Sequence, residues 1–537
     1  MKVLTRIALA GLLTLNALVI VMNAQYLYTT PIANTWVWWR GDETWLMAQY
    51  HHFLSTGHYL NPLAPGSVFS QSSGLLFGSC LLTAALYGLP LLFLKSHTID
   101  AGRTITLIFA ILTLFSLWLI AKRYRVSPVL RAYGCLLLAS SLCFFITSHS
   151  ARPDVLIGMT IMIFTGILPL MAEKNNINKA VLLGSLLPFC FLVNGHVLIV
   201  SFLTLCYSIF AAGVLRNRKY FIRMACAAIG GFAFLLILEW VLLGSASLLG
   251  PFSGASNSMP VVMLLHPKYD LGNLNWRYFI ANAWAPGVLW VSVVLAAALL
   301  WARIRFHIRL SQMDSAERRL VICSALAVVS SILFDYYWPR YFIYVLPSIV
   351  LSFVIVISYL ARTLPRASVS VLAAALTSCM VYAVLLYGIN AHTMGTAGQA
   401  ITSANKNAVT EALAAIHSHN LGKNNHSNPP RVFSTIPGQY IAMDDSCELL
   451  TPVIFDHPID TTISNSERWK RARIDYAIVC NPAYNYDWIQ TDSIIDWQAR
   501  SRSKIIFESI GLFSDIGRSY DPPGLKKLDT LRVYEFE

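Results

Sequence analysis

Two adjacent carboxylates, Asp42 and Glu43, follow closely on the first long apolar segment of this 537-residue chain. Trp36, Trp38 and Trp39 precede them, an aromatic cluster typical of a membrane interface. An acid beside an apolar wall has a raised pKa and can serve as a general base. The structural alternative is a helix cap, with Asp42 at the N-cap and Glu43 in the first turn. Both functions stay open, because a capped helix would also hold the carboxylate still.

Two further segments place an arginine at the end of an apolar run. The first, Arg152-Pro153-Asp154, also reads as ordinary helix-start chemistry, with proline at the start and an acid in the first turn. The second, 335–341, contains Arg340 and Tyr341, which belong either to an aromatic belt or to a site for an anionic headgroup. Guanidinium suits phosphate because it is always charged and offers paired donors.

A candidate histidine, His196, lies in Asn194-Gly195-His196, which interrupts an otherwise continuous apolar run. A tight hairpin explains this interruption as well as a functional histidine does.

The composition indicates which class of protein must position these groups. The chain is 56% hydrophobic and 12% charged, its mean hydropathy is +0.56, and its apolar runs reach the length of about 20 residues that spans a bilayer core. These values predict a polytopic α-helical membrane protein. The net charge of +13 comes from small basic groups between the apolar runs, a pattern of topology signals rather than of nucleic-acid binding.

Eleven apolar runs are predicted to cross the membrane. They are 7–27, 105–121, 132–147, 155–172, 180–193, 197–214, 224–243, 284–302, 320–334, 342–360 and 368–389. With a cytoplasmic N-terminus, eleven crossings place every dense basic cluster on the cytoplasmic side. The further apolar stretch 74–94 is then a re-entrant or interfacial segment of a first outer loop, 29–102. All the candidate groups named above consequently share the extracytoplasmic side.

The composition becomes that of a soluble protein in the last quarter of the chain. We therefore predict a transmembrane module, 1–390, and a small extracytoplasmic α/β domain, 391–537. The expected elements of this domain are a helix over 404–418 and strands over 431–435, 477–480 and 531–536. A disulfide between Cys447 and Cys480 is one option for it.

A family resemblance rests on these motifs in their order. Arg40-Gly41-Asp42-Glu43, followed by Tyr50 and by Ser55-Thr56-Gly57-His58-Tyr59, resembles the first outer loop of the GT-C glycosyltransferases. Among these, the protein O-mannosyltransferases and the lipid A aminoarabinose transferase are the most similar. Arg152-Pro153-Asp154 resembles their second acidic motif, and Trp338-Pro339-Arg340-Tyr341 with Pro347 resembles a late helix. The resemblance covers residues 1 to about 390.

The resemblance implies an enzyme of the inner (plasma) membrane that transfers a hexose or pentose, with inversion, from a polyprenyl-phosphate donor to a glycan, lipid or protein acceptor. Asp42, with Glu43, would be catalytic and act on the acceptor hydroxyl. Arg340 would hold the leaving phosphate, where charge builds during transfer. The remaining substrate contacts would come from Asp154, Arg152, Tyr341, His58, Tyr59 and His196.

Two departures from the family pattern limit this expectation. The stretch 60–65 is only a loose counterpart of a Glu-Lys-Pro-Pro motif, and no second acid completes an Asp-x-Asp at Asp154. We expect no required cofactor and no obligatory metal, while assistance by a divalent ion stays open. A transporter or flippase of lipid-linked sugars, and a lipid-linked oligosaccharide polymerase or ligase, are the alternative functions.

Overall fold

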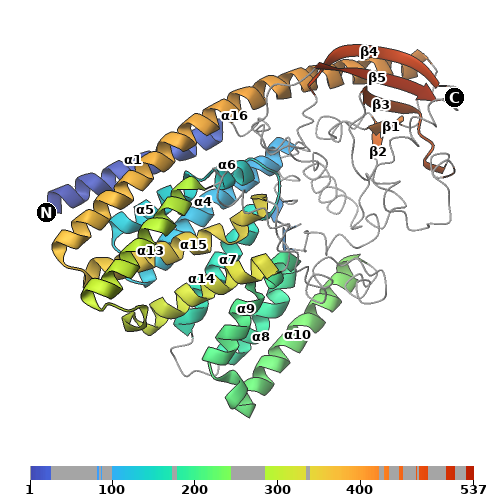
Figure 1. Cartoon of the computed structure of the whole chain (residues 1–537). Coiled ribbons are helices and arrows are strands. Elements are labelled where there is room, and N and C mark those ends of the chain that lie inside the picture. Colours follow the sequence, from blue (N-terminus) through green and yellow to red (C-terminus); the bar gives the residue numbers. More distant parts are fainter. Residues whose placement is uncertain are drawn as a thin grey trace.

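The computed structural model describes residues 2–25, 82–83, 86–87, 99–171, 178–243, 285–333, 339–422, 429–434, 447–450, 467, 471–481, 503–513 and 528–536. Most of these residues are helical (Figure 1). The α-helices are α1 (Lys2–Gln25), α4 (Ile99–Arg123), α5 (Pro128–Ala139), α6 (Leu142–Ser148), α7 (Asp154–Met171), α8 (Asn178–Val193), α9 (Gly195–Ala211), α10 (Arg218–Leu243), α13 (Pro286–Phe306), α14 (Ser315–Leu333), α15 (Leu346–Thr363) and α16 (Arg366–Gly422). Short 3-10 helices are η3 (Val214–Arg216), η4 (Leu310–Gln312) and η5 (Pro339–Tyr344).

Each predicted apolar run overlaps one of these helices. The run 132–147 forms two helices, α5 and α6, whose axes differ by 68°, and the run 342–360 begins in η5 and continues as α15. The bend arises at two serines. Ser140 ends α5, and Ser141 starts a new helix because its hydroxyl accepts a 3.2 Å hydrogen bond from the backbone N–H of Phe144. The bend gives α6 its own direction, in which it packs against η5.

Several helices are suited to a bilayer. Within the described residues, α1, α4, α13, α15 and α16 are long and apolar enough to cross a membrane, and the bent pair α5 and α6 could form a sixth span. α15 is central, because it packs against α4, α5, α7, α13 and α14. Peripheral helices expose apolar side chains such as Ile7, Ile229 and Val371, as helices that face lipid do. The total of eleven crossings stays a prediction.

A second core lies in the C-terminal part, where five strands form one sheet in the order β2-β1-β3-β5-β4. The strands are β1 (Arg431–Ser434), β2 (Glu448–Leu450), β3 (Tyr476–Asn481), β4 (Ser503–Phe513) and β5 (Leu528–Phe536). β1 is parallel to β2 and β3, whereas β5 is antiparallel to β3 and β4. The predicted strands correspond to β1, β3 and β5, and sequence reasoning missed β2 and β4.

α16 connects the two cores, because it runs along the helical bundle and ends against the sheet (Figure 1). Val409 and Ile416 on its last turns are fully buried against sheet residues such as Tyr476 and Val533. The predicted helix over 404–418 is therefore the end of a 57-residue helix. This helix passes through the predicted domain boundary at 390 without a break, and the boundary itself stays a prediction.

The strand register separates the two cysteines considered for a disulfide. Cys447 precedes β2 and lies level with Pro430, the residue before β1. On β3 the same level corresponds to Ile474, six residues before Cys480. Six residues of strand extend about 20 Å. A disulfide requires Cα atoms within roughly 7 Å of each other, so this sheet does not pair the two cysteines.

Candidate active site

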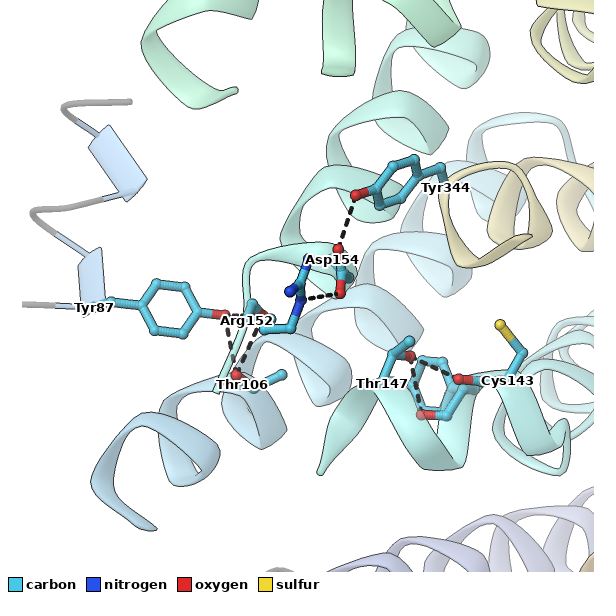
Figure 2. A network of polar contacts seen from close by, with 8 residues as sticks. Tyr87, Thr106, Cys143, Thr147, Arg152, Asp154 and Tyr344 are labelled. Atoms are coloured by element: carbon cyan, nitrogen blue, oxygen red, sulfur yellow. Dashed lines mark hydrogen bonds and ion pairs between the residues drawn. The ribbon is translucent and has the colours of Figure 1, made fainter. Parts of the chain in front are cut away.

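Asp154, the first residue of α7, lies at the centre of a buried polar network (Figure 2). Its Oδ2 accepts a 2.9 Å hydrogen bond from Nε of Arg152, which is also an ion pair. Its Oδ1 accepts a 2.8 Å hydrogen bond from the hydroxyl of Tyr344 in η5. The side chain of Asp154 is 2% exposed and that of Arg152 is 13% exposed. Asp154 therefore lies in the first turn of α7, as expected, and its carboxylate also joins the start of α7 to η5.

The backbone of Arg152 is fixed from a second direction. Tyr87, a buried residue of the stretch 74–94, donates a 2.8 Å hydrogen bond to the carbonyl of Arg152, and its hydroxyl lies 3.0 Å from that of Thr106 on α4. Thr83, four residues earlier in the sequence, donates to the carbonyl of Val193 at the end of α8. The side chains of Thr83 and Tyr87 are thus buried in the helical bundle, and the re-entrant path of the whole stretch 74–94 stays a prediction.

His196 reaches the same network from α9. α8 ends at Val193 and α9 begins at Gly195, so only Asn194 separates the two helices, which pack against each other. Asn194 caps α9, and its Oδ1 lies 2.8 Å from the backbone nitrogen and 2.7 Å from Nδ1 of His196. The imidazole ring packs on Tyr344, with ring centroids 5.8 Å apart. His196 therefore packs against the tyrosine that binds Asp154, and its role at the site stays a prediction.

A glycine allows η5 to approach α7 closely. Gly158 lies one turn after Asp154 on α7, and a Cβ atom built on it would collide with the backbone carbonyl oxygen of Ile343. Ile343 directly precedes Tyr344, so the absence of a side chain at Gly158 lets the phenol reach the carboxylate.

The structure thus brings together three of the predicted site residues, Arg152, Asp154 and His196. Arg340 and Tyr341 lie in η5, the element that also carries Tyr344, but their side chains fall outside the described part of the chain. The predicted residues Asp42, Glu43, His58 and Tyr59 lie outside the described residues.

Sequence reasoning missed Tyr344 and Tyr87. Both lie in apolar stretches, and a tyrosine buried in such a stretch needs a partner for its hydroxyl. That requirement is the signal that could have identified them.

This geometry suits an orienting role for Asp154. Both of its oxygens accept hydrogen bonds from protein groups and almost none of its surface is exposed, so it fixes Arg152 and Tyr344 rather than offering a base to solvent. Arg152 contributes a fixed positive charge at this end of the bundle. No cluster of three or more potential metal-binding side chains occurs among the described residues.

Comparisons with known proteins give structural matches. No protein-family model and no curated protein sequence matches the chain. Crystal structures of ArnT from Cupriavidus metallidurans match along nearly the whole chain. For the apo state the TM-score is 0.49 at 10% sequence identity, covering 92% of this chain and 93% of that one. For the undecaprenyl phosphate complex the TM-score is 0.48 at 11% identity, covering 98% of each chain.

An oligosaccharyltransferase from Archaeoglobus fulgidus, tethered to an acceptor peptide, matches with a TM-score of 0.48 at 10% identity. The match covers 88% of this chain and 69% of the archaeal one. The chain is thus similar to these ArnT and oligosaccharyltransferase structures along most of its length.

Proposed function

We propose that this chain is an integral membrane glycosyltransferase that moves a sugar from a polyprenyl-phosphate donor to an acceptor on the extracytoplasmic face. The observation that carries the proposal is the network in which Arg152, Asp154, Tyr344 and His196 meet at one end of an apolar helical bundle. A lipid-linked sugar has an apolar chain that suits lipid-facing helices and an anionic head that suits guanidinium groups at the helix ends.

In this proposal each group has a separate task. Asp42 deprotonates or orients the acceptor hydroxyl as the hydroxyl attacks the anomeric carbon, and Glu43 helps to shape the acceptor site. Arg340 stabilises the charge that builds on the leaving phosphate. The carboxylate of Asp154 holds Arg152 and Tyr344 in place for contact with the substrate.

The remaining predicted residues, His58, Tyr59, Tyr341 and His196, contact the sugar or the acceptor. For His196, the contact with Asn194 fixes the ring orientation, which a specific hydrogen bond to a sugar hydroxyl requires.

The distribution of buried charge favours an enzyme over a transporter. Among the helical residues whose side chains the structure describes, the buried Arg and acidic side chains are Arg103, Arg131, Asp154 and Glu317. Each lies at or within five residues of the start of its helix. A transport path would need such groups in the middle of helices, at the depth of the bilayer centre.

The proposed topology follows from charge. Lys122 and Arg123 end α4, Arg303 and Arg305 end α13, and Arg362 ends α15, which suits a cytoplasmic location for these ends. The polar network lies at the opposite ends of α4 and α15, and α16 then carries the C-terminal sheet on the extracytoplasmic side.

The test uses the purified full-length chain in liposomes that contain a radiolabelled polyprenyl-phosphate sugar and candidate acceptors. Transfer is measured by release of the sugar from the lipid and by mass spectrometry of the product. Asp42→Asn should reduce the transfer rate by at least roughly 100-fold, the usual contribution of a general base. Asp314→Asn, which changes an exposed acid just before α14, is the matched control and should leave the rate unchanged.

Three outcomes separate the candidate functions. Transfer that survives Asp42→Asn at the wild-type rate would remove the proposed base. Movement of the labelled lipid between leaflets without any transfer would identify a flippase. A product that grows by repeated units would identify a polymerase.

A further inference from the structure

A buried histidine outside the network, His149, joins two helix ends. Its Nδ1 lies 2.5 Å from the carbonyl oxygen of Phe145 in α6, and its Nε2 lies 2.5 Å from the carbonyl oxygen of Asn23 in α1. His149 is fully buried and is the C-cap of α6. The imidazole therefore connects the end of α6 to Asn23 of α1, which lies 126 positions before His149 in the sequence.

The two 2.5 Å contacts of the ring are both made with carbonyl oxygens, which can only accept hydrogen bonds. A neutral imidazole has one N–H, so both short contacts are hydrogen bonds only when the ring carries two hydrogens and a positive charge. Asn23 lies in the last turn of α1 and Phe145 in the last turn of α6. The negative ends of two helix dipoles thus converge on His149, an arrangement that stabilises a cation.

The neighbours of the ring hold this arrangement in place. The hydroxyl oxygen of Ser148 lies 2.9 Å from the carbonyl oxygen of Phe145, 3.2 Å from Oδ1 of Asn23 and 3.4 Å from Nδ1 of His149. Nδ2 of Asn23 donates to the carbonyl of Val19. The imidazole packs on the ring of Phe145 with centroids 4.3 Å apart. The contact between α1 and α6 is consequently built from several groups at once.

We propose that His149, as an imidazolium, is a positioning residue that fixes the end of α1 relative to the segment leading into Arg152 and Asp154. The chain that leaves α1 carries Asp42 and Glu43, and His149 precedes Asp154 by five residues. One bridge thus connects the segments that carry both acidic motifs. Its effect on catalysis rests on the proposed function, whereas the bridge itself does not.

The charge state is tested by nitrogen-15 NMR of histidine-labelled protein in liposomes, with His149→Gln used to assign the signal. The expected result is that both ring nitrogens of His149 resonate as protonated nitrogens. A ring with one protonated and one unprotonated nitrogen would overturn the imidazolium.

The bridge is tested by hydrogen exchange without substrate. In His149→Ala, amide exchange in the last turn of α1 should increase, while exchange in the buried helix α15 stays at the wild-type rate. His392→Ala, which removes an exposed histidine of α16, is the matched control and should change neither segment. Unchanged exchange at the end of α1 in His149→Ala would refute the bridge.

The catalytic consequence is tested by kinetics. His149→Ala should lower kcat by roughly 100-fold, as expected when a reacting group is misplaced by about 1 Å. The KM for the lipid-linked donor should stay near the wild-type value, because the change removes no donor contact. A wild-type kcat in His149→Ala would refute the positioning role. If the wild-type chain transfers no sugar, the proposed function fails, and NMR and hydrogen exchange still decide the bridge.

Discussion

Tyr344 donates a 2.8 Å hydrogen bond to Asp154, which lies 190 residues earlier in the chain. The phenol comes from η5, just before the central helix α15, and the carboxylate starts α7. Arg152 occupies the other carboxylate oxygen. A mobile acidic side chain is thereby converted into a fixed one, which is what a site needs in order to present its arginine in a single orientation.

Tyr344→Phe should destabilise the protein by about 1.5–3 kcal/mol, because it leaves a buried carboxylate oxygen without this donor. It should also reduce sugar transfer, since Arg152 loses part of its support. Chemical unfolding of the detergent-solubilised protein measures the first effect. Tyr382→Phe, which removes an exposed hydroxyl of α16, is the control and should match the wild type. Equal stability of the two variants would show that the bond contributes nothing.

The ion pair of Arg152 and Asp154 should be coupled energetically. Asp154→Asn and Arg152→Gln are each expected to destabilise the protein by about 3 kcal/mol, because each removes the oppositely charged partner of a buried group. The double variant should lose less unfolding free energy than the two single variants lose together, and the difference, the coupling energy, should be about 2 kcal/mol. A double-mutant cycle of unfolding free energies measures this. Additive costs would contradict a direct interaction.

Gly158→Ala should separate η5 from α7. The added methyl group meets the backbone carbonyl of Ile343, which cannot turn away as a flexible side chain could, so overpacking should cost roughly 1–3 kcal/mol. Transfer should fall together with stability, because the same shift lengthens the bond between Tyr344 and Asp154. Gly230→Ala is the control, since a Cβ there meets nothing within 4 Å. A Gly158→Ala variant with wild-type stability and activity would show that neither depends on the close contact between η5 and α7.

Hydrophobic patterning explains why the helices could be predicted from the sequence. Long apolar runs decide helix positions by themselves, because a chain in lipid must satisfy its backbone hydrogen bonds internally. The bend between α5 and α6 was not predicted, since Ser140 and Ser141 look like tolerated small residues until their capping geometry is known. The length of α16 was not predicted either. A change from apolar to polar composition marks a change of surroundings, and the helix continues through it.

The site could be predicted only in part, for a similar reason. Arg152, Asp154 and His196 were recognisable because polar residues at the ends of apolar runs stand out. Tyr344 did not stand out, because one tyrosine in an aromatic-rich stretch is ordinary. An apolar stretch around a tyrosine indicates that its hydroxyl needs a partner, but the identity of that partner depends on the close approach of η5 to Gly158, a long-range packing feature.

The contact between α16 and the sheet should determine whether the C-terminal part folds onto the helix. Ile416 is fully buried in the second core, so Ile416→Ala should cost about 2–5 kcal/mol there. Because this core is separate from that of the bundle, hydrogen exchange should increase in β3 and β5 while α7 and α15 stay protected. Leu421→Ala, which shortens an exposed side chain on the same helix, should leave exchange unchanged. Equal loss of protection in α15 would mean that the two cores unfold as one unit, with α16 as the rigid connection.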